Sequence, residues 1–229
     1  MADLNEKAER PLPGECLKPT PFLDFESPSV QDWLKKHPAR VGMTPVERAI
    51  ELYYLVRDGL RYNPYSVSVN PDQSRASSIV LMKQSYCIPK ATLLAALCRA
   101  EGIPSRLGFG DVKNHLSSPR LIEYLKSDIF LFHGFAELYL DGRWVRATPA
   151  FDARLCQKFR VAPLEFDGKT DCLFQAFDND GRKFMDYIRY HGVFADLPFD
   201  FIFDGLREAY PHLFHDGMPS GDLFAEIRA

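Results

Sequence analysis

The stretch YCIPKATLLAALCRAEGIPSR, from Tyr86 to Arg106, decides the fold because it places a helix directly before a strand. Pro89 suits the first turn of a helix, where a missing N–H costs nothing. An apolar body follows, and Gly102 is a typical stop signal. The pattern predicts a helix that begins at Cys87 or Ile88 and ends near Glu101.

Cys87 is the cysteine whose predicted position is chemically useful. Unpaired N–H groups and the positive dipole end at a helix N-terminus stabilise a thiolate, lower its pKa and can later bind an oxyanion. Cys98 lies about three turns further along the same helix among apolar neighbours, which predicts a core residue. On position alone, a buried structural thiol is the alternative for Cys87.

A nucleophilic cysteine needs a base, and one of the six histidines lies in a predicted strand. The mostly apolar run from Asp128 to Leu140 contains His133. Asp141-Gly142 is a strong hairpin signal, so we expect a partner strand over Arg143 to Thr148, with Leu140 paired to Arg143. A histidine without partners is more often a core residue, so the role of His133 depends on what lies opposite it.

The hairpin supplies two candidates for the group that orients His133. If the pairing continues in register, Asp152 lies opposite Leu131 and Thr148 opposite Phe135, both on the face of His133. Such diagonal neighbours are about 7–8 Å apart. We favour Asp152 over Thr148, because a hydroxyl stabilises an imidazolium less well than a carboxylate does.

Composition excludes several classes of protein. The chain has 229 residues, 28 Lys and Arg against 31 Asp and Glu, and a pI of about 6.1. It has no basic run, so we expect neither a nucleic-acid nor a membrane-surface partner. No apolar stretch reaches the roughly 20 residues of a membrane span, and the acidic, polar start is unlike a signal peptide.

The cysteine pattern indicates free thiols. No C-x-x-C or Cys/His cluster occurs, so we expect neither a disulfide framework nor a zinc site. We therefore expect a cytoplasmic protein with no metal. The five cysteines are Cys16, Cys87, Cys98, Cys156 and Cys172.

The remaining chain is divided by its patterns into three parts. We expect an extended N-terminal wrap over 1–43, a core over 44–152 and a C-terminal extension over 153–229 that completes the same domain. In the core, Thr44, Pro45 and Glu47 are typical of a capping box that opens a helix ending at Gly59. In the extension, the patterns predict two short helices, Lys183 to Tyr190 and Gly205 to Phe214.

These motifs together resemble the transglutaminase-like family of cysteine enzymes. Tyr86 to Arg106 resembles the family's cysteine helix with its G-I-P-[AS]-R turn, and His133 to Leu140 its histidine strand. Gly142 to Pro149 resembles the G-x-W strand that leads to the acid, and Val56 to Tyr62 the helix and tyrosine that precede the cysteine. The resemblance implies an α+β papain/transglutaminase-like core, in which the helix that carries the cysteine packs against an antiparallel sheet.

The resemblance also implies roles for the residues. Cys87 would be the nucleophile, His133 the base, and Asp152 or Thr148 the group that orients the imidazole. The family often has an acid directly before proline, where this chain has Thr148-Pro149. For the oxyanion we expect the N–H of Cys87 and a second donor from the candidates Gln84, Tyr86 and Tyr62.

Two functions are consistent with these motifs. The first is a cysteine hydrolase or acyltransferase, such as a peptidase or amidase, that acts on a peptide, protein or small amide through a Cys87 acyl-thioester and needs no cofactor. Hydrolysis is favoured over cross-linking, because a transferase must exclude water. The second is a catalytically inactive protein that keeps the fold as a binding or scaffold module.

Overall fold

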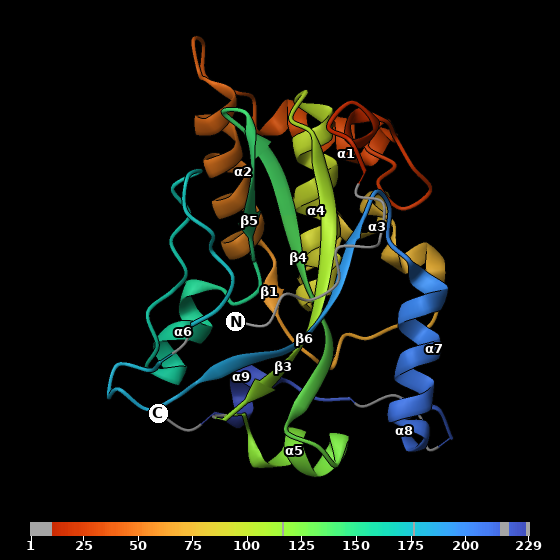
Figure 1. The fold of residues 1–229 in the computed structure, drawn as a ribbon, viewed down its shortest axis with the longest axis vertical. Coiled ribbons are helices and arrows are strands. Elements are labelled where there is room, and N and C mark those ends of the chain that lie inside the picture. The colour runs from red at the N-terminus through yellow and green to blue at the C-terminus, as the bar shows by residue number, and fades with distance from the viewer. Residues whose placement is uncertain (1–10, 116, 176, 216–219, 228–229) are drawn as a thin grey trace.

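The computed structural model describes residues 11–115, 117–175, 177–215 and 220–227. In this part of the chain, four antiparallel strands form a sheet in the order β5-β4-β3-β6, and two short parallel strands form a second sheet (Figure 1). The strands are β1 (Arg61–Tyr62), β2 (Gln84–Ser85), β3 (Ser105–Asn114), β4 (Ile129–Leu140), β5 (Arg143–Ala147) and β6 (Met185–Phe194).

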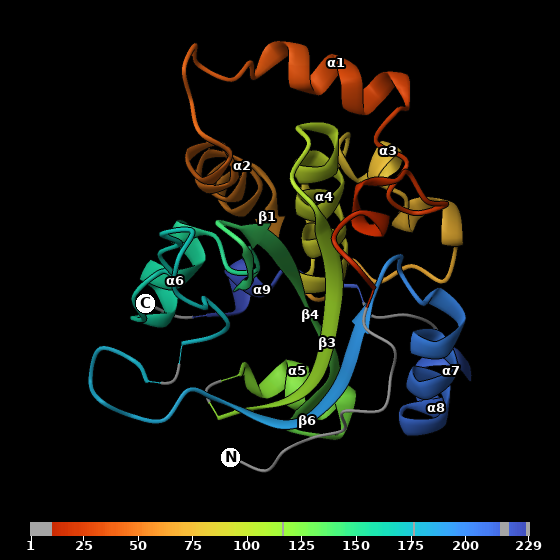
Figure 2. The same ribbon diagram turned by 45° about the horizontal axis from the view of Figure 1, so that its top comes forward.

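Helices lie around the four-stranded sheet, with α4 at the centre (Figure 2). The α-helices are α1 (Pro28–Lys36), α2 (Pro45–Gly59), α3 (Ala76–Ile79), α4 (Cys87–Ala100), α5 (Pro119–Leu125), α6 (Ala153–Phe159), α7 (Phe199–Ala209), α8 (Pro211–His215) and α9 (Leu223–Glu226). Two 3₁₀ turns, η1 (Glu15–Leu17) and η2 (Pro71–Ser74), complete the described elements.

Helix α4 forms the core of the protein. Every residue from Cys87 to Arg99 is buried, which is typical of a helix that is enclosed by other elements. The helix packs on β3 and β4 and also contacts α2 and α3. Since its first residue is Cys87, this packing fixes the thiol at the inner end of a rigid element.

The predicted capping box and hairpin are confirmed. Thr44 accepts from the N–H of Glu47, and the Glu47 carboxylate accepts from the N–H of Thr44, so α2 starts where the sequence indicates. Asp141 and Gly142 form the two-residue loop, and Leu140 pairs with Arg143. The predicted α+β fold class is confirmed as well.

A buried lysine ties α2 to α4. The Nζ of Lys90 donates to the carbonyl oxygens of Arg57 and Leu60, at the C-terminal end of α2. Burial lowers the Lys90 pKa to about 7, and the carboxylates of Asp152 and Asp58 act in the opposite direction. The amine thus satisfies helix-end carbonyls that would otherwise be buried without a donor.

Three predictions about the outer segments are wrong. Lys183 to Tyr190 is not a helix: Met185–Phe194 forms β6, which pairs with β3 through two irregularities. The N-terminal wrap is not extended throughout, because α1 begins at Pro28. The expected helix from Gly205 starts earlier, at Phe199, and Pro211 divides it into α7 and α8 by removing a backbone donor.

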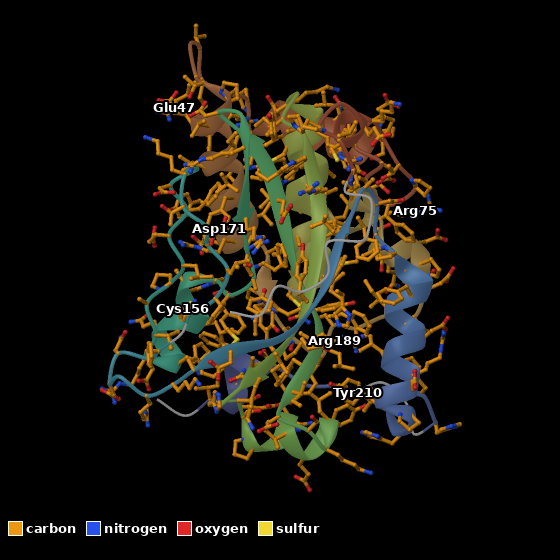
Figure 3. The ribbon with its side chains drawn as sticks, in the orientation of Figure 1. Glu47, Arg75, Cys156, Asp171, Arg189 and Tyr210 are labelled. Carbon is orange, nitrogen blue, oxygen red and sulfur yellow. The ribbon has the colours of Figure 1, made fainter. Side chains whose placement is uncertain are left out.

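The segment after residue 152 joins the body of the protein through β6 and the last helices. Tyr210, labelled in Figure 3, donates from its hydroxyl to the carbonyl of Ile129 in β4. Asn63 donates to the carbonyl of Gly221, and Tyr65 to the carboxylate of Glu226. These bonds hold the C-terminal helices beside the start of α4.

Candidate active site

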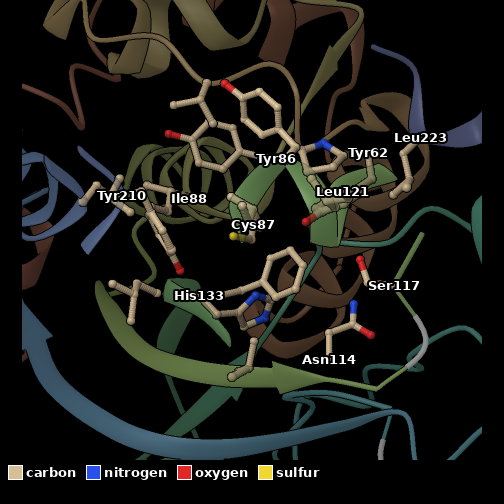
Figure 4. A pocket seen from close by; sticks show the side chains of 18 of the residues that line it. Tyr62, Tyr86, Cys87, Ile88, Asn114, Ser117, Leu121, His133, Tyr210 and Leu223 are labelled. Carbon is tan, nitrogen blue, oxygen red and sulfur yellow. The ribbon is translucent and has the colours of Figure 1, made fainter. Parts of the chain in front are cut away.

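Cys87 is the first residue of α4 and lines the cavity shown in Figure 4. The short pairing of β1 with β2 sets the chain direction just before it. The backbone N–H groups of Ile88 and Gly134 and its own N–H favour the thiolate, as the helix-terminal position predicts. Burial outweighs them and raises the Cys87 pKa to about 11, which is opposite to the expected direction.

Gly134 allows strand β4 to approach the start of α4. A Cβ at this position would lie 3.0 Å from the Cα of Ile88, closer than ordinary van der Waals contact. A side chain at this position would push β4 away from the start of α4 and move the Gly134 N–H away from the Cys87 sulfur. The glycine that follows the histidine is therefore part of the site.

His133 lies next to Gly134 on β4 and lines the same cavity. In Figure 4 its ring and the Cys87 sulfur point toward one another. Burial lowers the His133 pKa to about 4. Its Nε2 is buried and has no hydrogen-bond partner among the described residues. The resting pair is therefore a neutral thiol and a neutral imidazole across most of the pH range.

The backbone before His133 is held in an unusual conformation. Phe132 has a φ of 55°, which is rare for a residue with a side chain. Its N–H donates to Asp111, whose carboxylate also lies 2.7 Å from the Nε2 of His191. The His191 ring stacks on Phe132 at 4.5 Å between centroids. This group fixes the turn of β4 that aims His133 into the cavity, and no sequence motif indicates it.

Asp152 does not continue the strand, so its predicted place opposite Leu131 is wrong. Strand β5 ends at Ala147, and Asp152 caps α6 instead. Its carboxylate accepts from the N–H of Tyr62 at 2.9 Å and of Leu155 at 3.1 Å. As the N-cap of α6, the Asp152 carboxylate finds a hydrogen-bond donor within three residues, which a continued strand pairing would not supply. A role for Asp152 toward His133 stays a prediction.

Replacing Asp152 with alanine is expected to lower the free energy of unfolding by about 1–2 kcal/mol, the typical cost of a lost N-cap. The His133 pKa is expected to stay unchanged, because the Asp152 carboxylate accepts its hydrogen bonds from the backbone N–H groups of Tyr62 and Leu155. Urea unfolding and an NMR titration of the His133 ring measure the two effects. Asp222→Ala, which removes the cap of α9, is the matched control. A lower His133 pKa in Asp152→Ala would restore Asp152 as its partner.

Thr148 is the alternative candidate for the group that orients His133. It directly follows Ala147, which forms the last pair of β5 with Ala136 of β4. Its side chain is buried, and its hydroxyl has no partner among the described residues. Its N–H donates to the carbonyl of Cys172. Thr148 and His133 are thus two of the residues with a buried polar atom that has no hydrogen-bond partner among the described residues, which is uncommon in folded proteins.

The three candidates for the second oxyanion donor, Tyr62, Tyr86 and Gln84, do not all lie in the same place. Tyr62 and Tyr86 line the cavity together with Cys87. Burial raises the pKa of both phenols, so they keep their protons and can donate. Gln84 lies instead in a small cavity beside Asp152, and its side-chain oxygen accepts from Arg61.

The other cysteines differ from Cys87 in their surroundings. All five are free and buried. Burial raises the pKa of the Cys98 thiol well above its usual range and that of the Cys156 thiol to about 12. Neither lines the cavity that holds His133. Within the described residues, no group of His, Cys, Asp and Glu side chains could hold a metal ion.

The buried His133 is expected to make stability depend on pH. Its pKa is 6.5 in an unfolded chain and about 4 in the folded protein, so the unfolded state binds more protons between these values. Stability therefore falls as the pH falls from 6.5 to 4, by about 3 kcal/mol in all. Urea unfolding at several pH values should show this loss in wild type and a smaller one in His133→Gln. Phe135→Leu, which removes no titrating group, should keep the wild-type dependence.

The helix, the sheet and the thiol beside an imidazole define an α+β protein of the papain/transglutaminase-like class. A family model described as the transglutaminase-like superfamily matches residues 35–149, half of the chain. The match includes Cys87, His133 and Thr148 and ends before Asp152. The chain therefore belongs to the transglutaminase-like superfamily.

The comparisons with curated proteins and with solved structures do not extend this assignment. No curated protein matches the chain significantly. The crystal structure of a proposed cysteine protease from Cytophaga hutchinsonii is similar, with 18% identity and a TM-score of 0.47. The similarity covers 84% of this chain and 56% of that one, so this chain spans little more than half the length of that protein. Among the described residues, no helix is long and apolar enough to cross a bilayer.

Proposed function

We propose that this protein is a cysteine enzyme that cleaves or transfers an amide or related acyl group through a Cys87 acyl-thioester. The observation that carries the proposal is that Cys87 and His133 line one cavity, with the thiol at a helix N-terminus and the imidazole facing it. The N–H of Gly134 adds a further donor to the sulfur. These are the parts that thiol-based acyl transfer needs.

The neutral resting pair suits a general-base mechanism. As the Cys87 sulfur attacks the carbonyl carbon, its proton passes to His133, and the N–H of Cys87 with a phenol of Tyr62 or Tyr86 stabilises the oxyanion. The tetrahedral intermediate then expels the amine, which takes the proton from His133. Water attacks the thioester carbon, releases the acid and returns the proton to sulfur. Hydrolysis is the simpler outcome, because water needs no second binding site.

An inactive binding protein is the second candidate, and two observations favour it. No carboxylate hydrogen-bonds to His133 in the described residues, and the imidazolium that forms during attack would be poorly stabilised. The Cys87 pKa of about 11 leaves almost no thiolate at neutral pH. The two candidates therefore differ in whether His133 removes the thiol proton.

The pH dependence of alkylation separates these candidates. If His133 acts as the base, Cys87 should react with iodoacetamide at a rate that is nearly constant from about pH 5 to pH 10, since only the neutral pair is needed. Without assistance, the rate should rise about tenfold per pH unit up to the thiol pKa. Peptide mapping by mass spectrometry follows Cys87 against Cys98, and His133→Gln is the matched variant. A steep rise in wild type would support the inactive protein.

A further inference from the structure

The cavity beside Cys87 is almost free of charge. Its volume is about 120 Å³, and aliphatic and aromatic side chains form most of its lining. Apart from His133, the described residues that line it include no Asp, Glu, Lys or Arg. An apolar cavity of about 150 Å³ takes up benzene. The slightly smaller cavity of this protein can therefore hold a compact hydrocarbon tail of about five carbons next to the carbonyl carbon.

Residues outside the family match build part of this cavity. Strand β6 contributes Met185, and the helices that follow contribute Leu206, Leu213 and Leu223. Figure 4 shows Leu223 and Leu121 on one side of the sulfur and Ile88 with Tyr210 on the other. The apolar walls thus combine residues of the family match with residues of the C-terminal segment beyond residue 149.

From the cavity we infer that the substrate carries an uncharged aliphatic or aryl acyl group, of about six carbons, which binds in this cavity. The inference rests on the proposed function, because it concerns the group that stays bonded to Cys87 after the amine leaves. An acidic or basic acyl group would lose its hydration with no counter-charge in the lining. A peptide segment would bury amide groups in the same apolar surroundings, so a hydrocarbon fits better.

The bond changes are those of ordinary acyl transfer. The sulfur–carbon bond forms as the carbon–nitrogen or carbon–oxygen bond to the leaving group breaks, and the thiol proton leaves with that group through His133. The acyl chain stays in the cavity while water attacks the thioester carbon. These steps require no oxidant, reductant or cofactor.

Acylation of the wild-type protein by p-nitrophenyl esters tests the inference. The second-order rate for Cys87 should rise about fourfold per methylene from acetate to hexanoate, the factor expected for burying each group. Over four methylenes this is about 250-fold. The charged monosuccinate ester should react more slowly than the butyrate ester of similar length. Equal rates for all four esters would overturn the inference and leave the proposed function intact.

A filled cavity should remove this preference. Leu213→Trp places a larger side chain in the wall, so the ratio of the hexanoate rate to the acetate rate is expected to fall at least fivefold. Leu81→Trp, at a position that is 74% exposed and outside the cavity, should keep the wild-type ratio. Thermal unfolding of both variants verifies folding. An unchanged ratio in folded Leu213→Trp would place the acyl group elsewhere.

Binding without chemistry separates the two proposals. In Cys87→Ala, ligand-observed NMR should detect hexanamide but not acetamide or succinamate at equal concentration. Hexanamide binding with no acylation of the wild-type protein would keep the apolar site and contradict the proposed function. No difference among the three amides would contradict the inference, whatever the wild-type protein does with the esters.

Discussion

Replacing Cys87 with alanine is expected to abolish turnover of p-nitrophenyl esters, with a loss of at least about 10³-fold. The sulfur is the atom that bonds to the acyl group, and no other cysteine lines the cavity with His133. Because Cys87 is already small and buried, alanine removes little packing, so the fold should remain. Turnover is measured by release of p-nitrophenol, and the acyl-enzyme by intact mass.

His133→Gln should reduce the same turnover by about 10²–10⁴-fold, the range for loss of a general base. It should leave a residual rate that rises with pH toward the Cys87 pKa of about 11. Cys98→Ala, at the far end of the same helix, is the matched control and should keep turnover. If the loss in Cys87→Ala equals that in Cys98→Ala, the nucleophile lies elsewhere.

Replacing Glu137 with alanine is expected to lower the free energy of unfolding by about 3–5 kcal/mol, the cost of breaking a buried ion pair on one side. Glu137 and Arg106 are both 4% exposed at the side chain, and their charged atoms lie 2.6 Å apart. Arg146 also donates to Glu137, at 3.0 Å. Without the carboxylate, the guanidinium of Arg106 stays buried over the Trp144 ring with no counter-charge.

Urea unfolding measures the loss of stability in Glu137→Ala. The double variant Glu137→Ala with Arg106→Met tests whether the unpaired charge of Arg106 causes that loss. Removing both charges should recover much of the lost stability, because no unpaired charge remains. Asp32→Ala breaks the exposed pair with Lys35 and should leave the midpoint nearly unchanged. A double variant no more stable than Glu137→Ala would assign the loss to packing instead of charge.

The local elements of the fold could be predicted because their signals are short-range. The capping residues Thr44 and Glu47, the Asp141-Gly142 loop and the start of α4 to within one residue each depend on neighbours within a few positions. Strand β6 could not be identified in this way. Its alternation is broken where it pairs with β3, and its pairing partner lies about 80 residues earlier in the chain.

The candidate site also has features that could be predicted from short-range signals and features that could not. A thiol at a helix N-terminus and a histidine in an apolar strand could be read from residues 86–106 and 128–140. The direction of the Cys87 pKa could not, because burial by distant segments outweighs the local N–H groups. The place of Asp152 could not be predicted either, because Asp152 caps α6 instead of extending β5.

The sequence by itself determined the helix start at Cys87 or Ile88 and the hairpin after His133, because local hydrogen bonds and side-chain periodicity specify these features. Its motifs also indicated the transglutaminase-like family through their resemblance. The tertiary structure alone decided how close Gly134 comes to α4, how Asp111 and His191 fix the backbone before His133, and how apolar the cavity is. Each depends on groups far apart in the chain. Their contacts, burial and desolvation exist only once the chain has folded.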